Sequence, residues 1–141
     1  MTVSFTPYLR FPGTTREALA FYAEVLGGTV EVTTYGEFGH TEDGMADKVM
    51  HSTLKADGIE LHAADEPEGT ATGGTPRVGI ALALMSAEPG NLEQVFARLA
   101  DGGEVTTPLE RQAWGDTYGE VTDRFGVAWM IDFHDPVAEA G

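Results

Sequence analysis

The stretch Leu-Gly-Gly-Thr-Val at residues 26–30 decides the fold, because its glycine pair recurs 75 residues later in Asp-Gly-Gly-Glu-Val at residues 101–105. The same shift carries Phe21 to Phe96. Each glycine pair follows apolar residues at helical spacing, and glycine is the usual residue just past a helix end. Each pair also precedes a segment with the composition of a strand. We therefore interpret the chain as two copies of one supersecondary unit.

The segments around each glycine pair follow the same predicted order of strand, helix and three strands. In the first half the predicted segments are strand 4–11, helix 15–26, strand 29–35 and strands 49–55 and 59–64. In the second half they are strand 78–85, helix 91–101, strand 104–109 and strands 118–122 and 127–133. Asp57-Gly58 favours a two-residue type I′ turn between the last two strands of the first half.

Both predicted helices begin with the residue spacing of a capping box. Thr14 with Glu17, and Asn91 with Gln94, are predicted to satisfy each other's free backbone donors. Residues 65–77 are rich in Gly, Thr, Pro and acid, and are predicted to link the halves. We expect a single domain over residues 1–141, with module one at about 1–70 and module two at about 76–135.

The composition excludes several classes of function. The chain has 8 Lys+Arg against 23 Asp+Glu, a net charge of −15, so we expect neither nucleic acid nor an anionic membrane surface as a partner. It has no cysteine, which excludes disulfides, thiolate metal sites and thiol nucleophiles. No apolar run approaches the roughly 20 residues of a membrane span, and no secretion signal is visible. We expect a cytoplasmic protein.

Several sequence blocks carry a resemblance to a known family. They are Pro-Tyr-Leu at 7–9, Ala-Leu-Ala-Phe-Tyr at 18–22, Leu-Gly-Gly at 26–28, His51, Asp65, Trp-Gly at 114–115, Tyr-Gly at 118–119 and Asp-Arg-Phe-Gly-Val-Ala-Trp-Met-Ile at 123–131. With them the chain resembles the vicinal-oxygen-chelate superfamily of glyoxalases, bleomycin-resistance proteins and dioxygenases, and within it the PhnB-like (3-demethylubiquinone methyltransferase-like) branch. The resemblance implies an α+β fold in which paired βαβββ modules form a curled mixed sheet. This sheet encloses a cup, with the helices outside.

In metal-using members of this superfamily, four side chains from the first and last strand of each module bind one divalent ion. The resemblance places these positions at Thr6 or Pro7, His62, Ala81 or Leu82, and Met130. Three of the four carry side chains that bind hard or borderline cations poorly. We therefore expect no inherited metal and no cofactor, with one alternative left open. That alternative is a divalent ion held by His51, His62 and the carboxylate of Glu60 or Glu120.

Side-chain alternation predicts which residues would face the cup. The turn at Asp57-Gly58 pairs Thr53 with His62, and this register separates an apolar face that packs on the helix from a polar one. In the first strand Phe5, Leu9 and Phe11 are predicted to lie on the packed face of the sheet, away from the cup. The predicted ligand-binding residues are Tyr8, Arg10, His51, Glu60, His62, Trp114, Tyr118, Glu120 and Met130.

We interpret the chain as a small-molecule-binding protein of the glyoxalase/bleomycin-resistance type, with a small organic ligand that has an acidic or hydroxylated end. The alternative is an isomerase or lyase of the superfamily, with Glu120 or His51 as the candidate general base. His51 could equally make a structural hydrogen bond, and His62 could simply pair with Thr53 or Glu60. Because a single module leaves an open sheet edge, we also expect a homodimer.

Overall fold

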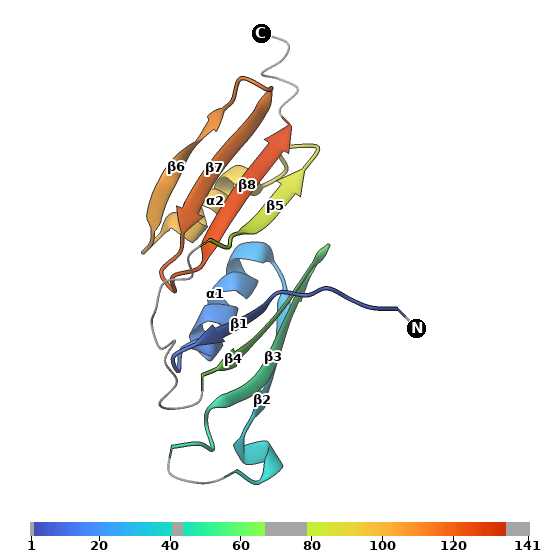
Figure 1. Cartoon of the computed structure of the whole chain (residues 1–141), viewed down its shortest axis with the longest axis vertical. Coiled ribbons are helices and arrows are strands. Elements are labelled where there is room, and N and C mark those ends of the chain that lie inside the picture. Colours follow the sequence, from blue (N-terminus) through green and yellow to red (C-terminus); the bar gives the residue numbers. More distant parts are fainter. Residues whose placement is uncertain (1, 41–43, 67–78, 135–141) are drawn as a thin grey trace. The chain divides into compact units, whose positions relative to one another are not determined.

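The structure is a computed structural model that describes residues 2–40, 44–66 and 79–134 (Figure 1). The chain divides into two compact units, Met1–Thr75 and Pro76–Gly141. Each unit holds one four-stranded mixed sheet and one α-helix.

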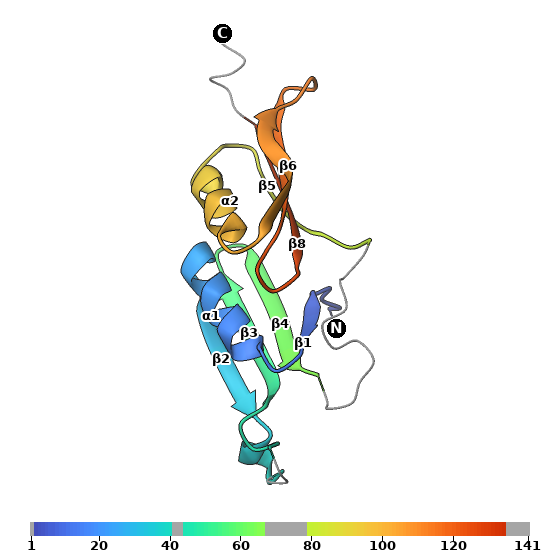
Figure 2. The ribbon, with the colours of Figure 1, turned by 90° about the vertical axis from the view of Figure 1, so that its left-hand side faces the viewer.

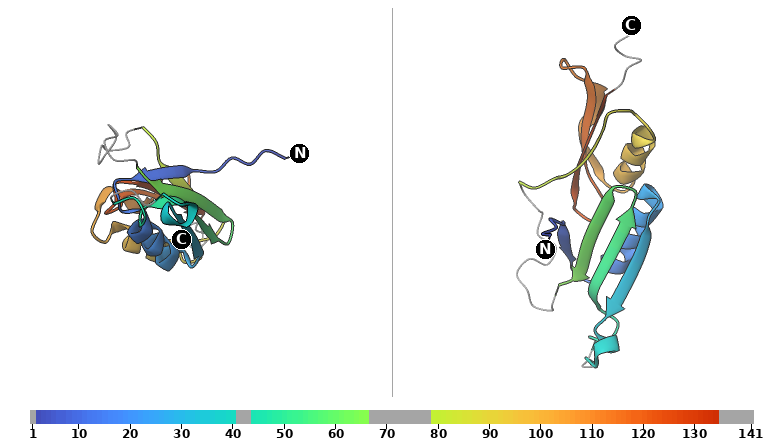
Figure 3. Two further views of the ribbon diagram at one scale, coloured as in Figure 1. Left: turned by 90° about the horizontal axis from the view of Figure 1, so that it is seen from below. Right: turned by 90° about the vertical axis from the view of Figure 1, so that its right-hand side faces the viewer.

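The first unit contains β1 (Tyr8–Phe11), α1 (Thr15–Leu26), β2 (Thr29–Thr34), the short 3₁₀ helix η1 (Gly36–Phe38), β3 (Val49–Ala56) and β4 (Ile59–Asp65). Its strand order is β1-β4-β3-β2, with β1 parallel to β4 and the other pairs antiparallel. The helix α1 covers one face of this sheet (Figure 2). The right-hand view of Figure 3 shows β4, β3 and β2 side by side with α1 behind them.

The second unit contains β5 (Leu82–Ser86), α2 (Leu92–Ala100), β6 (Glu104–Arg111), β7 (Asp116–Thr122) and β8 (Ala128–His134). Its strand order is β5-β8-β7-β6, with β5 parallel to β8, so it repeats the topology of the first unit. The predicted succession of strand, helix and three strands in each half is confirmed. Strand β5 begins later than predicted, and residue 78 lies outside the described residues.

The core of each unit lies between its helix and one face of its sheet. In the first unit it includes Phe11, Leu19, Tyr22, Leu54, Leu61 and Ala63. In the second it includes Val95, Phe96, Leu99, Val121, Trp129, Ile131 and Phe133. These side chains follow period 2 along the strands, which leaves the opposite face of each sheet to the polar set.

The repeated glycine pair has a physical reason in both units. Gly27 and Gly102 adopt positive φ (76° and 78°), the left-handed conformation that ends a helix at little cost to glycine. A Cβ on Gly28 would lie 2.6 Å from the carbonyl oxygen of Lys55. A Cβ on Gly103 would clash with the backbone of Thr122 and Asp123, where β7 ends. Any larger residue at the second position would therefore push the helix–strand connection away from the sheet.

The predicted capping boxes are wrong. Thr14 and Asn91 occupy the N-cap positions, but neither makes a side-chain capping bond. In the first unit the buried carboxylate of Asp65 takes this role, because it accepts hydrogen bonds from the backbone N–H of Thr15 (3.0 Å) and of Val49 (2.9 Å). The cap of α1 is thus a tertiary contact between the end of β4, the helix and β3.

Asp123 organises the β7–β8 turn of the second unit. Its Oδ1 accepts hydrogen bonds from the backbone N–H of Phe125 (2.8 Å) and Val127 (3.1 Å). Its Oδ2 accepts the indole Nε1–H of Trp129 (2.8 Å). This buried carboxylate ties the β7–β8 turn to Trp129, a core side chain.

The prediction that Phe5 packs inside is wrong, because β1 begins only at Tyr8 and Phe5 is fully exposed (101%). The carbonyl of Pro7 still accepts a hydrogen bond from the N–H of His62. Proline has no N–H to donate the next bond of a parallel ladder, so pairing with β4 stops there. None of the helices in the described part of the chain is long and apolar enough to cross a membrane.

Candidate functional site

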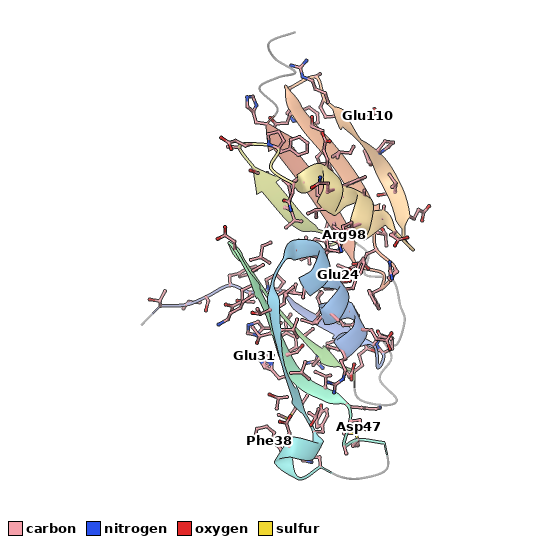
Figure 4. All side chains as sticks on the ribbon, turned by 180° about the vertical axis from the view of Figure 1, so that it is seen from behind. Glu24, Glu31, Phe38, Asp47, Arg98 and Glu110 are labelled. Carbon is pink, nitrogen blue, oxygen red and sulfur yellow. The ribbon has the colours of Figure 1, made fainter. Side chains whose placement is uncertain are left out.

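The face of the first sheet opposite α1 carries a row of side chains that spans all four strands. The register sets Tyr8 of β1 beside His62 of β4, His62 beside Thr53 of β3, and Thr53 beside Glu31 of β2. Glu31 is labelled on β2 in Figure 4. The pairing of Thr53 with His62 confirms the register that the sequence predicted.

Five side chains on this face form a contiguous group, which we call the Tyr–His cluster: Tyr8, Arg10, His51, Glu60 and His62. The rings of Tyr8 and His51 are nearly parallel, with an interplanar angle of 11° and centroids 5.8 Å apart. The His51 and His62 ring centroids are 5.0 Å apart, and the guanidinium carbon of Arg10 lies 5.9 Å from the Tyr8 centroid. The cluster therefore presents aromatic, imidazole and cationic groups side by side.

Glu60 orients one imidazole of this cluster. His62 Nε2 lies 3.0 Å from Glu60 Oε2, so in neutral His62 the hydrogen on Nε2 donates to the carboxylate and Nδ1 is an acceptor. Both side chains are partly exposed, and such a surface pair stabilises a fold little. The contact therefore matters mainly because it sets the tautomer that a ligand would meet.

The corresponding face of the second sheet is acidic. The register pairs Glu120 with Met130, Tyr118 with Asp132, and Asp116 with His134. Glu110 of β6, labelled in Figure 4, lies beside Tyr118 and extends that row. The six side chains of these three pairs are all partly buried.

Glu120 is held by hydroxyl groups. Thr107 Oγ1 donates to Glu120 Oε2 at 3.0 Å. Partial burial raises the pKa of Tyr118, and the hydrogen bond with Glu120 and the charges of Glu120 and Asp132 raise it further. The centroids of the Trp114 and Tyr118 rings lie 6.2 Å apart, and the two rings meet edge-on. The Trp114 side chain is largely exposed (64%), so its ring is accessible for stacking.

Asp132 and Asp116 form a carboxyl pair that the sequence interpretation did not identify. Partial burial raises the pKa of Asp132, and the hydrogen bond with Asp116 and the charge of that carboxyl add to the effect. Asp116 Oδ1 also lies 3.4 Å from Nδ1 of His134, a residue to which the sequence assigned no role. The alternation that predicted Met130 on this face also places Asp132 and His134 there, so the signal was present.

The structure brings the predicted residues together in two sets. Tyr8, Arg10, His51, Glu60 and His62 share the first sheet's face. Trp114, Tyr118, Glu120 and Met130 lie in the second unit, the last three on the acidic face and Trp114 against Tyr118. That both sets serve one ligand stays a prediction.

The residues present do not fit the divalent ion that the superfamily implies. The register sets Tyr8 beside His62, instead of the predicted Thr6 or Pro7, and Ala83 beside Met130, instead of the predicted Ala81 or Leu82. Of the four residues in these two pairs, only the imidazole is a good ligand for a borderline cation. Within residues 2–40, 44–66 and 79–134, no three or more His, Cys, Asp or Glu side chains are grouped to hold a metal ion. The alternative site of His51, His62 and Glu60 therefore has no support in the first unit.

Comparison with known proteins identifies the family. The sequence model of the Glyoxalase/Bleomycin resistance protein/Dioxygenase superfamily matches residues 5–131. The chain belongs to this superfamily. The match spans the blocks on which the resemblance rested, and the glyoxalase-type fold confirms the predicted α+β architecture of paired βαβββ modules.

Several relatives of this superfamily member cover nearly all of it. Protein YjdN of Escherichia coli is 27% identical over 140 residues, which are 90% of this chain and 92% of that protein. The crystal structure of protein PA1353 of Pseudomonas aeruginosa has a TM-score of 0.84 at 33% identity and covers 95% of this chain and 99% of its own.

More distant structures share the fold alone. The PhnB protein of Bacillus cereus has a TM-score of 0.76 at 24% identity, covering 93% of this chain and 99% of its own. The fosfomycin resistance protein FosX of Mesorhizobium loti has a TM-score of 0.59 at 6% identity, with both chains fully covered.

Proposed function

We propose that this superfamily member binds a small organic ligand through the sheet faces that its helices leave uncovered, without the family's metal ion. The observation that carries the proposal is the Tyr–His cluster, in which stacked rings, two imidazoles and a guanidinium group share one face of the first sheet. Such convergent aromatic and polar groups are the usual lining of ligand sites.

The proposed ligand has an acidic or hydroxylated end. The chain carries only 8 Lys+Arg, yet Arg10 lies in the same cluster as His51 and His62. Arginine and imidazole donors are suited to carboxylate or hydroxyl oxygens, and the Tyr8 ring offers apolar contact beside them. We propose that Trp114, Tyr118, Glu120 and Met130 form a second set of ligand-contacting side chains within the second unit.

An isomerase or lyase that uses Glu120 or His51 as general base is the alternative. The contacts of Glu120 favour binding over such catalysis, because the hydroxyls of Thr107 and Tyr118 already bond to this carboxylate. Fewer of its lone pairs remain for a substrate proton.

The experiment is a thermal-shift screen of small aromatic and carboxylated compounds, followed by calorimetric titration of any compound that raises Tm. His51→Ala should weaken binding of that compound by about 2- to 12-fold, the equivalent of a lost neutral hydrogen bond of about 0.5–1.5 kcal/mol, and leave the fold intact. His40→Ala, which removes an exposed histidine outside the cluster, is the matched control.

Two results would contradict the proposal. If His51→Ala lowers Tm strongly without changing affinity, His51 is a structural residue. If protein purified without a histidine tag contains stoichiometric divalent metal by elemental analysis, the enzyme alternative is favoured instead.

We also propose that the protein is a homodimer with an apolar contact, because the outer strands of each four-stranded sheet pair on one side only among the described strands. Light scattering at micromolar concentration should then report twice the chain mass of 15.0 kDa. A 15.0 kDa particle would contradict this part of the proposal.

A further inference from the structure

The segment Thr2–Thr6, which we call the arm, places apolar side chains in solvent. Val3 is 89% exposed and Phe5 is fully exposed. Figure 1 and the left-hand view of Figure 3 show this segment running away from the rest of the first unit as an extended chain. A neighbouring pair of exposed large apolar residues on an extended segment is typical of a contact surface.

The arm alternates like a strand but has no partner strand in its own sheet. Thr2, Ser4 and Thr6 all carry hydroxyl groups and lie on one side of the extended segment, while Val3 and Phe5 lie on the other side. The missing N–H of Pro7 stops the ladder with β4 just before the arm, and none of the described strands pairs with residues 2–6.

The sequence of the arm is complementary to itself. When two copies run antiparallel with Ser4 opposite Ser4, Val3 faces Phe5 and Thr2 faces Thr6. Aromatic–β-branched pairs and threonine pairs are among the favourable cross-strand contacts. The same patch then serves both copies, as a two-fold interface requires.

Charge also favours a second copy as the occupant. The chain carries a net charge of −15, so two copies repel each other over most of their surface. Residues 2–9 contain no charged side chain. The arm is therefore a place where two copies can meet without setting like charges against each other.

We propose that two copies of this chain pair their arms as antiparallel strands about a two-fold axis at Ser4, with Val3 and Phe5 of both copies forming one apolar cluster. This inference rests on the homodimer part of the proposed function and names the element that forms the contact.

The absence of cysteine allows a direct test of the register. In Ser4→Cys the new thiol is the only one in the chain, and the proposed axis sets it opposite its own copy at a distance that a disulfide can bridge. Mild oxidation should give a covalent dimer on a non-reducing gel, and reduction should reverse it. Ala97→Cys, on an exposed position of α2, is the control and should stay monomeric on the gel.

A second variant measures the contribution of the apolar cluster. Phe5→Ser should weaken dimerisation roughly a hundredfold, because each copy loses an apolar contact equivalent to about a factor of ten. Light scattering over a dilution series gives this change. Phe38→Ser, which replaces a 63% exposed aromatic residue of η1, is the matched control and should dimerise like the parent chain.

The outcomes separate the inference from the proposal beneath it. A parent chain that is monomeric at every concentration overturns both the homodimer and the arm pairing. A dimer that neither crosslinks through Ser4→Cys nor weakens in Phe5→Ser overturns the arm pairing alone. A dimer that weakens in Phe5→Ser without crosslinking through Ser4→Cys overturns the two-fold register at Ser4.

Discussion

Removal of the Asp123 carboxylate should be one of the most destabilising single substitutions in the second unit. The carboxylate accepts three hydrogen bonds, from the backbone N–H of Phe125 and Val127 and from the indole of Trp129. The turn donor at Phe125 is only partly buried, so water can replace its bond in Asp123→Ala. The other two bonds are buried, and Asp123→Ala removes the carboxylate acceptor from both of them.

The magnitude follows from the loss of these two buried hydrogen bonds. Each buried donor without a partner costs about 1–3 kcal/mol, and removal of a buried charge returns part of that sum. We expect Asp123→Ala to lower the free energy of unfolding by about 3 kcal/mol. For a domain near 150 residues, each kcal/mol shifts Tm by roughly 2–4 °C, so Tm should fall by about 6–12 °C.

Urea unfolding followed by tryptophan fluorescence measures this directly, because Trp129 is one of the partners. Asp123→Asn keeps one acceptor oxygen and should lose less than Asp123→Ala. Asp101→Ala is the matched control: its exposed carboxylate pairs with Arg124 at the surface, so it should cost less than about 0.5 kcal/mol. A loss below about 1 kcal/mol in Asp123→Ala would refute the view that this carboxylate organises the turn.

Two further predictions concern the acidic face and the helix–sheet contact of the second unit. Burial and the neighbouring Asp116 raise the pKa of Asp132 in the folded chain, so the folded state holds this proton more tightly than the unfolded state does. The folded state therefore loses stability as pH rises from the usual carboxyl range through that raised pKa. Asp132→Asn should therefore raise Tm at pH 7 and change it less at pH 4; thermal melts across pH check this, and an equal shift at both pH values would count against it. Gly119→Ala would set a Cβ 2.8 Å from the Cα of Leu109 and 2.9 Å from the Phe96 ring, and such overpacking should cost about 1–3 kcal/mol in urea unfolding, whereas a neutral result would mean that both β6 and the ring yield without cost.

Much of the fold could be predicted from the sequence because its signals are local. The glycine pairs at 27–28 and 102–103 mark both helix ends, and a two-residue turn at Asp57-Gly58 determines the register of the first hairpin. Once that register is known, alternation alone assigns His51 and His62 to the face away from α1. The first-unit half of the candidate site follows from these steps.

The features that escaped prediction depend on residues far apart in the chain. The cap of α1 comes from Asp65, which is 50 residues from the N–H that it accepts, and no capping motif encodes this contact. The contact between the carboxyl groups of Asp116 and Asp132, which lie on neighbouring strands but are not partners in the register, requires a β7–β8 ladder that runs without a bulge through seven residue pairs. The exposure of Phe5 depends on the lost N–H of Pro7 at the edge of the sheet, although the apolar alternation there reads as a packed strand.

Equivalent positions of the two units show where the repeat retained its residues and where it diverged. The residues that shape the scaffold agree: the left-handed glycine, the crowded second glycine and the buried alternate positions recur in both halves. The exposed sheet faces do not agree, because His62 and Met130 both lie four residues after a turn glycine, and their cross-strand partners are Thr53 and Glu120. A single inherited metal site would require matched metal ligands at the positions of His62 and Met130. His62 carries an imidazole beside a second imidazole, whereas Met130 carries a thioether beside carboxyl groups, so the two uncovered sheet faces differ in chemistry and do not repeat one set of metal ligands.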